Sequence, residues 1–424
     1  MSEQGKPTKP EWTRRRLLAA LAAGAGASVS GVALAQDRKS AAADIDATPT
    51  SNSTERVDPT RTQGAGPSAL GARSPFETPM RSPGYGVISG TPLQDLHGTI
   101  TPADLHFERH HAGIPQIDPG QHELLLHGLV STPLRFTLAD LLRFPAETQT
   151  CFLECSGNLR TTAGESTTPQ DLCGLTSQSE WTGVRVSTLL QEAGVRPSAK
   201  WLLAEGRDAA RLGRSIPIEK MMGDAMVAYA QNGEALRPAQ GYPMRLLLPG
   251  WEGNTNVKWL RRIDVSDRPF MTREETSKYT EPIRGGHARQ FSFTMDARSV
   301  ITTPSYPAHL EPGWHEIRGL AWSGRGKIAQ VDVSVDGGRN WRVAKLAGPV
   351  RPMSHTRFTL PYNWTGGGAE LSSRATDETG YVQPTRRTLI DARGPGSVPY
   401  HLNPIVSWIV EKDGRVIYKA EPWT

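Results

Sequence analysis

One stretch of the chain places a cysteine where it could bind a soft metal. Residues 151–160 read Cys-Phe-Leu-Glu-Cys-Ser-Gly-Asn-Leu-Arg, so a strand-like run over 150–154 delivers Cys155 to a Ser-Gly-Asn turn. A thiolate is a suitable ligand for soft or high-valent metals, and cationic neighbours such as Arg160 would lower the pKa of the thiol. The alternative is an inert structural cysteine, because free cysteine is among the most buried residue types. The spacing alone leaves both interpretations open.

Two further clusters combine basic residues in a way that suits anions. Residues 106–111 read His-Phe-Glu-Arg-His-His, which puts Arg109 beside histidines. Farther along, a loop, a buried strand and a second loop over 237–259 place Arg245 and Lys258 at the two ends of the strand. Arginine offers planar paired donors that stay charged, so both clusters could bind a phosphate or a sulfur oxyanion. The alternative for each cluster is a solvated loop.

Several familiar sites are missing from the sequence. It contains no G-x-S-x-G, P-loop, H-E-x-x-H, dinucleotide glycine fingerprint or C-x-x-C-H motif, so it gives no sign of the corresponding hydrolase, nucleotide or zinc-protease sites and predicts no c-type haem in this chain. Six of the eleven histidines lie between His97 and His127. A histidine-only zinc site is disfavoured there, because Gly113 and Pro115 cut short the helix that would align His106 with His110.

The N-terminus predicts export. Residues 13–18 read Thr-Arg-Arg-Arg-Leu-Leu and precede an uncharged Ala- and Gly-rich stretch that ends in Ala33-Leu34-Ala35. This pattern is typical of a cleaved twin-arginine signal over residues 1–35, which places the protein in the periplasm. A retained membrane span is disfavoured because glycines and serines dilute the apolar run, and no later stretch is long and apolar enough to span a bilayer.

Composition narrows the remaining classes. The 424 residues carry a net charge of +5, but the first 35 residues supply three of those charges, so no nucleic-acid footprint is left. Three cysteines are too few for a disulfide scaffold, and their odd number leaves at least one thiol free or bound to a metal. The 42 glycines and 33 prolines indicate a turn-rich chain. Residues 36–75 lack aromatic side chains, so we expect a flexible arm over 36–94.

The periodicity of the remaining chain predicts two kinds of fold. Residues 95–285 mix the two element types and indicate an α+β domain. The strand-like runs there are 122–129, 201–204, 243–248 and 257–265, and the helix-like runs are 137–144 and 187–193, each with a hydroxyl N-cap, and 218–230. Residues 286–424 show short alternating runs between Gly, Asn and Asp turns, which is typical of an immunoglobulin-like sandwich. Those runs are 314–322, 328–335, 341–346, 355–360, 371–376 and 407–410, and Asp336-Gly337-Gly338 is a hairpin signal.

These clusters resemble the sulfite oxidase family of mononuclear molybdenum enzymes over residues 95–420 and, within it, the sulfane (sulfite) dehydrogenase branch of bacterial thiosulfate oxidation. The motifs that carry the resemblance occur in the family's order at residues 107–111, 153–158, 241–245, 257–260, 334–341 and 374–384. The resemblance implies an α+β molybdopterin domain over 95–285 and an immunoglobulin-like dimerisation domain over 286–424. It also implies one molybdenum–molybdopterin per chain, with Cys155 as the sole protein ligand of the metal.

The resemblance also implies roles for individual residues. Arg109, Arg160 and Tyr279 would face the substrate oxyanion. The residues that would hold the pterin and its phosphate are His111, Asp208, Gln240, Arg245, Asn256 and Lys258. Cys151 and Cys173 are expected to be structural, and whether they form a disulfide stays open.

The implied reaction is a two-electron oxidation of sulfane sulfur or sulfite, with oxygen from water and electrons passed to a c-type cytochrome subunit with two haems. A homodimer of this chain within a heterotetramer is expected, with a sulfur-carrier protein or a small sulfur oxyanion as substrate. Four departures from the family pattern, His110, Leu159, Gln240 and His401, leave the pocket less cationic. From this we hypothesise a larger or protein-bound sulfane substrate. The alternatives are a periplasmic sulfoxide reductase on the same cofactor, against which the sandwich domain argues, and a non-catalytic exported carrier.

Overall fold

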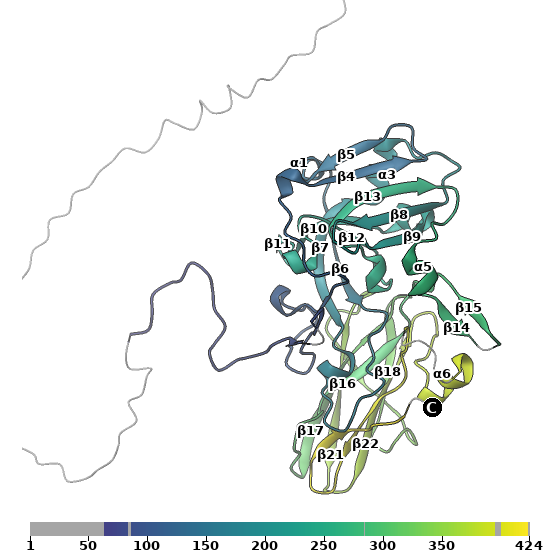
Figure 1. Ribbon diagram of the computed structural model, residues 1–424. Coiled ribbons are helices and arrows are strands. Elements are labelled where there is room, and N and C mark those ends of the chain that lie inside the picture. Colours follow the sequence, from purple (N-terminus) through teal and green to yellow (C-terminus); the bar gives the residue numbers. More distant parts are fainter. Residues whose placement is uncertain (1–62, 84–85, 284, 395–399, 423–424) are drawn as a thin grey trace, which may run out of the picture. The chain divides into compact units, whose positions relative to one another are not determined.

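The computed structural model describes residues 63–83, 86–283, 285–394 and 400–422 (Figure 1). The predicted signal over 1–35 and the first part of the predicted arm, up to residue 62, lie outside the described residues. Residues 63–71 contain no helix or strand. Residues 72–424 form one compact unit, which carries every element described below.

A mixed five-stranded sheet begins the first domain (Figure 1). Its central strands β4 and β13 run parallel, and the other pairs are antiparallel. Burial alternates along β4, and Leu124 and Leu126 are fully buried on the core face. In spatial order the strands are β5 (Leu134–Thr137), β4 (Glu123–Gly128), β13 (Leu260–Ser266), β8 (Trp201–Gly206) and β9 (Gly213–Pro217).

A second sheet leads directly to the predicted metal ligand. Strand β6 (Glu147–Glu154) pairs antiparallel with β7 (Thr176–Arg185) up to its last residue, so the chain leaves the sheet at Cys155. The remaining strands of this sheet are β10 (Met226–Gln231), β11 (Glu234–Ala235) and β12 (Arg245–Leu247). The strand expected before Cys155 is therefore present.

A short three-stranded sheet changes the expected end of the N-terminal arm. It consists of β1 (Ser82–Pro83), β2 (Ile88–Gly90) and β3 (Glu108–Arg109). Strand β2 pairs with β3, and Leu93 is buried in the core, so residues 82–83 and 86–94 belong to the folded unit and not to a flexible arm. Burial of apolar area offsets the cost of ordering this segment.

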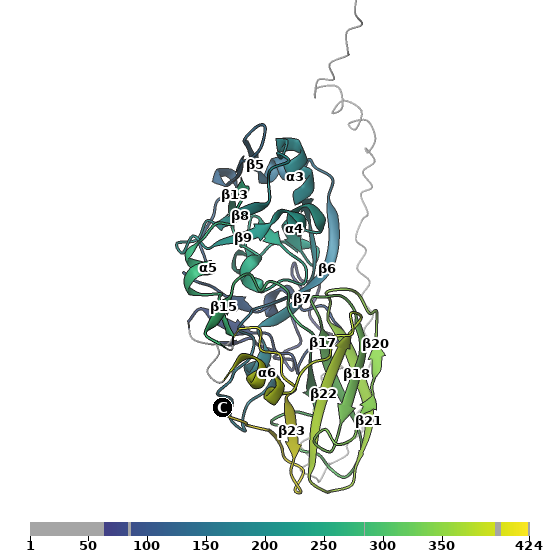
Figure 2. The same ribbon diagram turned by 90° about the vertical axis from the view of Figure 1, so that its right-hand side faces the viewer.

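The helices of the first domain are short. Helix α1 begins after Thr137 with the expected hydroxyl cap, and Asp140 completes a capping box there. Helix α3 begins after Arg185 without a side-chain cap, so the predicted hydroxyl cap is wrong there. The helix expected over 218–230 ends at Gly223, because the next residues form the buried strand β10. Helices α3 and α4 lie side by side (Figure 2). The helices are α1 (Leu138–Leu141), α2 (Pro169–Cys173), α3 (Val186–Ala193), α4 (Ile218–Gly223) and α5 (Arg273–Ser277), with single turns η2 (Ala103–Leu105), η3 (Pro119–Gln121), η4 (Pro238–Gln240) and η5 (Gly253–Thr255).

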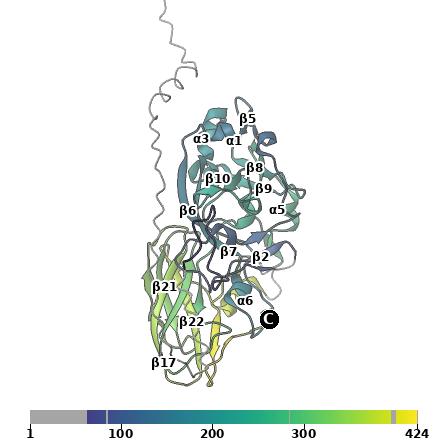
Figure 3. The same ribbon diagram turned by 90° about the vertical axis from the view of Figure 1, so that its left-hand side faces the viewer.

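The C-terminal domain is the predicted β-sandwich (Figures 2 and 3). Its inner faces bury Trp322, Phe358 and Trp408 in one apolar core. The hairpin after β18 is present, with Gly337 and Gly338 at positive φ. The first sheet contains β16 (Arg298–Thr303), β17 (Gly313–Trp322), β21 (Thr356–Trp364) and β20 (Lys345–Ala347), and the second contains β19 (Arg342–Val343), β18 (Ile328–Ser334), β22 (Ala369–Asp377), β23 (Ser407–Val410) and β24 (Val416–Tyr418).

One expected strand of the sandwich is divided. The run over 341–346 forms β19 and β20, which belong to opposite sheets, because the chain crosses between them at Ala344. The linking hairpin β14 (Glu281–Ile283) and β15 (His287–Arg289) and helix α6 (Arg386–Arg393) complete the described elements.

The sandwich core extends into the first domain. Phe152, Leu159 and Leu172, which surround the Cys155 loop in sequence, pack into the same buried cluster as the sandwich residues. The loop that carries Cys155 is therefore supported by both domains. Among the described residues, the helices are too short or too polar to cross a bilayer.

Candidate active site

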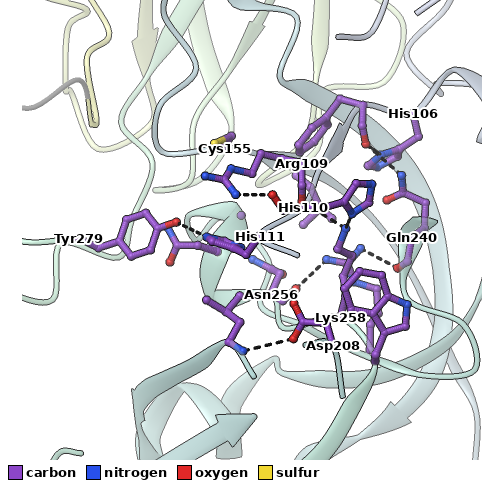
Figure 4. Close-up of a pocket in the computed structure, with 17 residues that line it drawn as sticks. His106, Arg109, His110, His111, Cys155, Asp208, Gln240, Asn256, Lys258 and Tyr279 are labelled. Atoms are coloured by element: carbon purple, nitrogen blue, oxygen red, sulfur yellow. Dashed lines mark hydrogen bonds between the residues drawn. The ribbon is translucent and has the colours of Figure 1, made fainter. Parts of the chain in front are cut away.

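A single pocket collects most of the predicted site residues (Figure 4). It contains about 670 Å³ of space free of protein atoms, a volume that includes open solvent at its mouth. Nine of the ten predicted residues line it: Arg109, His111, Cys155, Asp208, Gln240, Arg245, Asn256, Lys258 and Tyr279. The roles proposed for them remain predictions, but sequence segments up to 170 residues apart do meet here.

Cys155 is partly buried at the wall of the pocket, on a loop with fixed ends. Its backbone N–H donates to the Leu175 carbonyl at 3.0 Å, and its carbonyl accepts the Asn158 N–H at 3.0 Å. Burial raises the pKa of the Cys155 thiol, although a backbone hydrogen bond from Gly157 and the charge of Arg109 oppose this shift. The expected lowering of this pKa by cationic neighbours is therefore wrong for the protein alone, because desolvation is the larger effect.

Strand β3 and the residues after it form one wall of the pocket. Arg109 lies next to Cys155 and donates to the His110 carbonyl at 2.5 Å (Figure 4). Nε2 of His111 lies 3.0 Å from the Tyr279 hydroxyl. Burial, with the charge of Arg109, lowers the pKa of His111 to about 3, and burial also raises the pKa of Tyr279. At neutral pH both side chains are uncharged, so the positive charge on this wall belongs to Arg109.

Two buried cations define the other wall. The guanidinium of Arg245 donates to the carbonyls of Gln240 at 3.1 Å and Asn256 at 2.8 Å. Nζ of Lys258 donates to the Ala239 carbonyl at 2.9 Å and contacts Nδ1 of His110 at 2.8 Å. Burial lowers the pKa of Arg245 to about 9, and burial together with the charge of Arg245 lowers the pKa of Lys258 well below its ordinary value. Both pKa shifts arise because a positive charge is buried away from water.

A glycine allows these two cations to approach each other. Gly241 has φ of +111°, and a Cβ there would lie 3.0 Å from Cβ of Arg245 and 3.2 Å from Cβ of Lys258. Any larger residue would therefore push the two basic segments apart. Gln240 anchors the same turn to β3, because its Nε2 donates to the Phe107 carbonyl at 3.0 Å.

The remaining predicted residues, Asn256 and Asp208, contribute polar groups to the lining of the pocket. Oδ1 of Asn256 accepts the Leu248 N–H at 2.6 Å, which fixes the loop before Lys258. Oδ1 of Asp208 accepts the Leu212 N–H at 3.3 Å. Asn256 therefore faces the pocket from a rigid loop.

Two residues named in the sequence analysis lie elsewhere. Arg160 is exposed and lines a separate cleft with Asn158 and Gln170. His401 is buried, and its Nε2 pairs with Glu252 at 3.1 Å. Although burial opposes it, the Glu252 carboxylate raises the pKa of His401. Neither side chain lines the pocket, so the pocket lacks one cation, Arg160, that the resemblance placed there.

Sequence reasoning missed some lining residues. His106 is buried, with burial lowering its pKa to about 3, and its Nε2 has no hydrogen-bond partner among the described residues. Oδ1 of Asn254 is likewise buried without a partner in the described part of the chain. The polar run Gly253–Asn256 between two apolar strands was the signal that could have drawn attention to Asn254.

These features fit the cofactor implied by the resemblance. Burying a charge is costly unless it is paired, and the described residues hydrogen-bonded to Arg245 are backbone carbonyls. An anionic group such as a phosphate would supply the missing partner, and the unsatisfied atoms of His106 and Asn254 would meet the polar edge of a heterocycle. Among the described residues, no group of three or more His, Cys, Asp or Glu side chains could hold a metal.

Comparison with known proteins identifies both domains. Residues 111–274 match the family described as oxidoreductase molybdopterin binding domain, and residues 289–407 match the Mo-co oxidoreductase dimerisation domain. The chain is 31% identical to sulfite oxidase of Gallus gallus over 376 residues, covering 79% of this chain and 81% of that protein. It is also 31% identical to a nitrate reductase [NADH] of Ulva prolifera, of which it spans 38% of the length.

A solved structure agrees with these matches. The crystal structure of the sulfane dehydrogenase SoxCD from Paracoccus pantotrophus superposes with a TM-score of 0.81 at 45% sequence identity, covering 85% of this chain and 97% of that chain. The predicted fold class is confirmed, and the non-catalytic carrier alternative is set aside, because the first domain is a molybdopterin-binding oxidoreductase domain. The chain belongs to the sulfite oxidase family of molybdopterin oxidoreductases.

Proposed function

We propose that this protein is a periplasmic sulfane dehydrogenase, which oxidises a sulfane sulfur held on a carrier protein and passes the electrons to a c-type cytochrome. The observation that carries the proposal is the convergence of Arg109, Arg245 and Lys258 on the pocket beside the Cys155 thiol. Buried positive charge of this kind favours an anionic cofactor and an anionic substrate at the same place.

Most of the pocket residues would hold the cofactor. Cys155 would bind the molybdenum, and Arg245 and Lys258 would pair with the phosphate of the pterin. The residues that would contact the rest of the pterin are His111, Asp208, Gln240 and Asn256. When bound, molybdenum–molybdopterin supplies two-electron redox chemistry and an oxygen that derives from water.

The substrate would enter between Arg109 and Tyr279. Arg109 orients the terminal anionic sulfur or oxygen, and its charge stabilises the anion without taking up a proton. Neutral His111 can donate from Nε2 to the Tyr279 oxygen, so that the phenol proton points toward the substrate. Each turnover adds one water oxygen to sulfur and releases two electrons and two protons.

The shortage of arginines supports a sulfane substrate over free sulfite. Small oxyanions are bound by several converging arginines, but here Arg160 lies in another cleft and His401 is paired with Glu252. The proposal therefore assigns no substrate contact to Arg160. The similarity to a structure described as sulfane dehydrogenase supports the same choice.

Location, partners and domain limits complete the proposal. The twin-arginine pattern supports export and removal of residues 1–35. The dimerisation domain over 289–407 supports a homodimer, and the absence of a C-x-x-C-H motif in the sequence means that haems would come from a separate cytochrome subunit. We keep 95–285 and 286–424 as the functional domains, with 82–94 added to the first.

The proposal can be tested on protein purified from a cofactor-competent host. We expect about one molybdenum per chain and faster reduction of a cytochrome with a persulfide on a carrier-protein cysteine than with free sulfite. Far better turnover of free sulfite would assign the enzyme to sulfite, and reduction of a sulfoxide without either oxidation would favour the sulfoxide reductase alternative. The N-terminal sequence of the periplasmic protein should start near residue 36.

A further inference from the structure

A buried arginine that does not itself line the pocket contacts two of the segments that do. Arg214 lies on β9 and is about 1% exposed. Its NH1 pairs with Oε1 of Glu252 at 3.0 Å and its Nε pairs with Oε1 of Glu275 at 2.7 Å. Its Cζ lies 4.9 Å from the centroid of the Tyr279 ring. One guanidinium thus joins the loop after β12, helix α5 and a residue of the pocket.

The two carboxylates fix the position of this guanidinium. Glu275 also accepts the Ser215 N–H at 3.0 Å and a short hydrogen bond from the Thr272 hydroxyl. Glu252 accepts Nδ2 of Asn254 at 2.8 Å and pairs with His401. Burial lowers the pKa of Arg214 and raises that of Glu252, but their mutual attraction outweighs both effects. Arg214 therefore remains charged and held from two directions.

Tyr279 depends on few other contacts. Its backbone N–H donates to the Glu274 carbonyl at 2.9 Å, its hydroxyl meets His111, and its ring packs near Tyr400 at a centroid distance of 5.2 Å. The segment after it is a two-stranded hairpin at the edge of the domain, with exposed residues in β15. The face of the ring against Arg214 is the contact made with a rigid, fully buried group.

We propose that Arg214 is a positioning residue, which holds the Tyr279 ring and the Glu252–Asn256 loop at fixed places in the lining of the pocket. A planar guanidinium can accept a ring on its face while its edge binds two carboxylates, which an ammonium cannot do. The inference rests on the proposed function only where it predicts turnover, since the placement of Tyr279 can be measured without it.

The first test measures the ring itself. Fluorotyrosine is incorporated at position 279 of the molybdenum-loaded protein, and its ¹⁹F resonance is recorded for the unchanged chain and for Arg214→Lys. Lysine keeps the buried charge but not the planar face, so we expect a shifted and broadened resonance. The matched control is Arg374→Lys, because Arg374 also pairs with a carboxylate, Asp332 at 3.0 Å, and stacks on an aromatic ring, Trp341 at 4.5 Å, far from the pocket. An identical resonance in the Arg214 variant would overturn the proposal.

The second test is a double-mutant cycle on turnover of sulfite with ferricyanide as acceptor. Arg214→Lys should lower kcat/KM about fivefold when Tyr279 is present and less than about twofold in a Tyr279→Leu background. A general loss of structure would lower both by the same factor, and that result would also overturn the proposal. If Arg214→Lys does not fold, Glu275→Gln, which loosens the hold on Arg214 Nε, should give the same ¹⁹F change. An unsubstituted enzyme with neither sulfite nor persulfide turnover would refute the proposed function, while the ¹⁹F result would still decide the role of Arg214.

Discussion

The two sides of the Cys155 loop bury charge in opposite ways. On the pocket side, Arg245 and Lys258 are held by backbone carbonyls, and burial lowers the pKa of each. On the other side, the carboxylate of Glu154 accepts Nε1 of Trp322 at 2.7 Å and NH1 of Arg298 at 3.0 Å, both from the sandwich domain. The paired charge of Glu154 thus supports the loop from the sandwich side. The charges of Arg245 and Lys258 on the pocket side have no anionic partner among the residues that the structure describes, so binding of an anion there would stabilise them.

Buried charges that support the fold can be distinguished from buried charges that bind a ligand by whether their partners are complete. Removing one partner of a fully paired buried ion is costly, but such an ion has no free hydrogen-bonding capacity for a ligand. A buried cation without an anionic partner is instead stabilised when an anion binds to it. Arg298 and Trp322 face each other across β16 and β17, so the sandwich domain fixes the residue next to the predicted metal ligand. One carboxylate thus links the sandwich domain to the loop that carries the predicted metal ligand.

The largest expected effect is the loss of the thiol that lies between the two sides. Cys155→Ala should lower turnover by at least about ten-thousandfold, about 5.5 kcal/mol of activation free energy, because no other described cysteine faces the pocket. The protein should still fold and be exported. Steady-state kinetics and circular dichroism check both statements.

Cys151→Ala is the control for this substitution. Cys151 is fully buried, and burial raises the pKa of its thiol to about 12, so it is expected to be inert. The same holds for Cys173, and the two thiols are free in the structure, which answers the disulfide question left open by the sequence. Retained activity in Cys155→Ala would remove the basis for the metal assignment.

The side of the loop on which Glu154 is paired is tested by removing one of the hydrogen-bond donors to this carboxylate. Trp322→Phe leaves Glu154 short of one hydrogen bond, and we expect the free energy of unfolding to fall by about 2 kcal/mol, with a Tm lower by about 5 °C. Molybdenum content should not change, because Trp322 does not line the pocket. Calorimetry and metal analysis measure the two quantities.

Trp408→Phe is a matched control for the same lost indole. Nε1 of Trp408 donates to the neutral Ile301 carbonyl at 3.0 Å, and Trp408 is as fully buried as Trp322. Hydrogen bonds to charged groups are the stronger class, so the control should cost about half as much. An equal decrease in the free energy of unfolding of both variants would show that the charge on Glu154 does not strengthen its hydrogen bond with Trp322.

On the pocket side, Arg109→Met should weaken binding of the substrate anion while the metal is retained. One charge-assisted hydrogen bond is lost, so we expect KM to rise about tenfold and molybdenum content to stay constant. Steady-state kinetics with a carrier-bound persulfide and with sulfite measures the change. Arg160→Met gives the comparison, and a rise in KM as large as that of Arg109→Met would show that Arg160 enters the pocket, against its exposed position in the structure.

The residues on the pocket side of the Cys155 loop could be predicted from the sequence, but the charge pairs on its other side could not. Cys155, Arg245 and Lys258 lie in local motifs with basic or turn-forming neighbours, so their chemistry is visible within a few residues. Glu154 and Trp322 are 168 residues apart, and the pair Glu252–His401 elsewhere in the molecule spans 149 residues, so only the folded chain reveals these pairs. The failed helix over 218–230 has a similar origin, because burial of β10 between β7 and β11 or β12 overrides the helix-forming tendency of Ala and Met.

The smallest expected effect is a pH dependence that separates the apoprotein from the loaded enzyme. The folded pKa of Lys258 lies below its ordinary value of 10.5, because burial, Arg245 and Arg109 oppose the charge more than Glu108 and Asp208 support it. Below 10.5 and above the folded pKa, the unfolded chain binds more protons than the folded apoprotein, so the apoprotein becomes more stable as pH rises.

A bound phosphate favours the charged form of Lys258 and therefore reduces this slope. Urea unfolding of apoprotein at pH 7, 8 and 9 should therefore show a free energy that increases by less than about 1.4 kcal/mol per pH unit, with a smaller increase in loaded enzyme. Lys258→Met should flatten the slope of the apoprotein and also reduce cofactor retention, whereas the exposed pair Arg135–Glu123 offers a control, Arg135→Met, that should change neither. Equal slopes for apoprotein and loaded enzyme would mean that Lys258 does not meet the anion, and the contrast between the two sides of the loop would then rest on Arg245 alone.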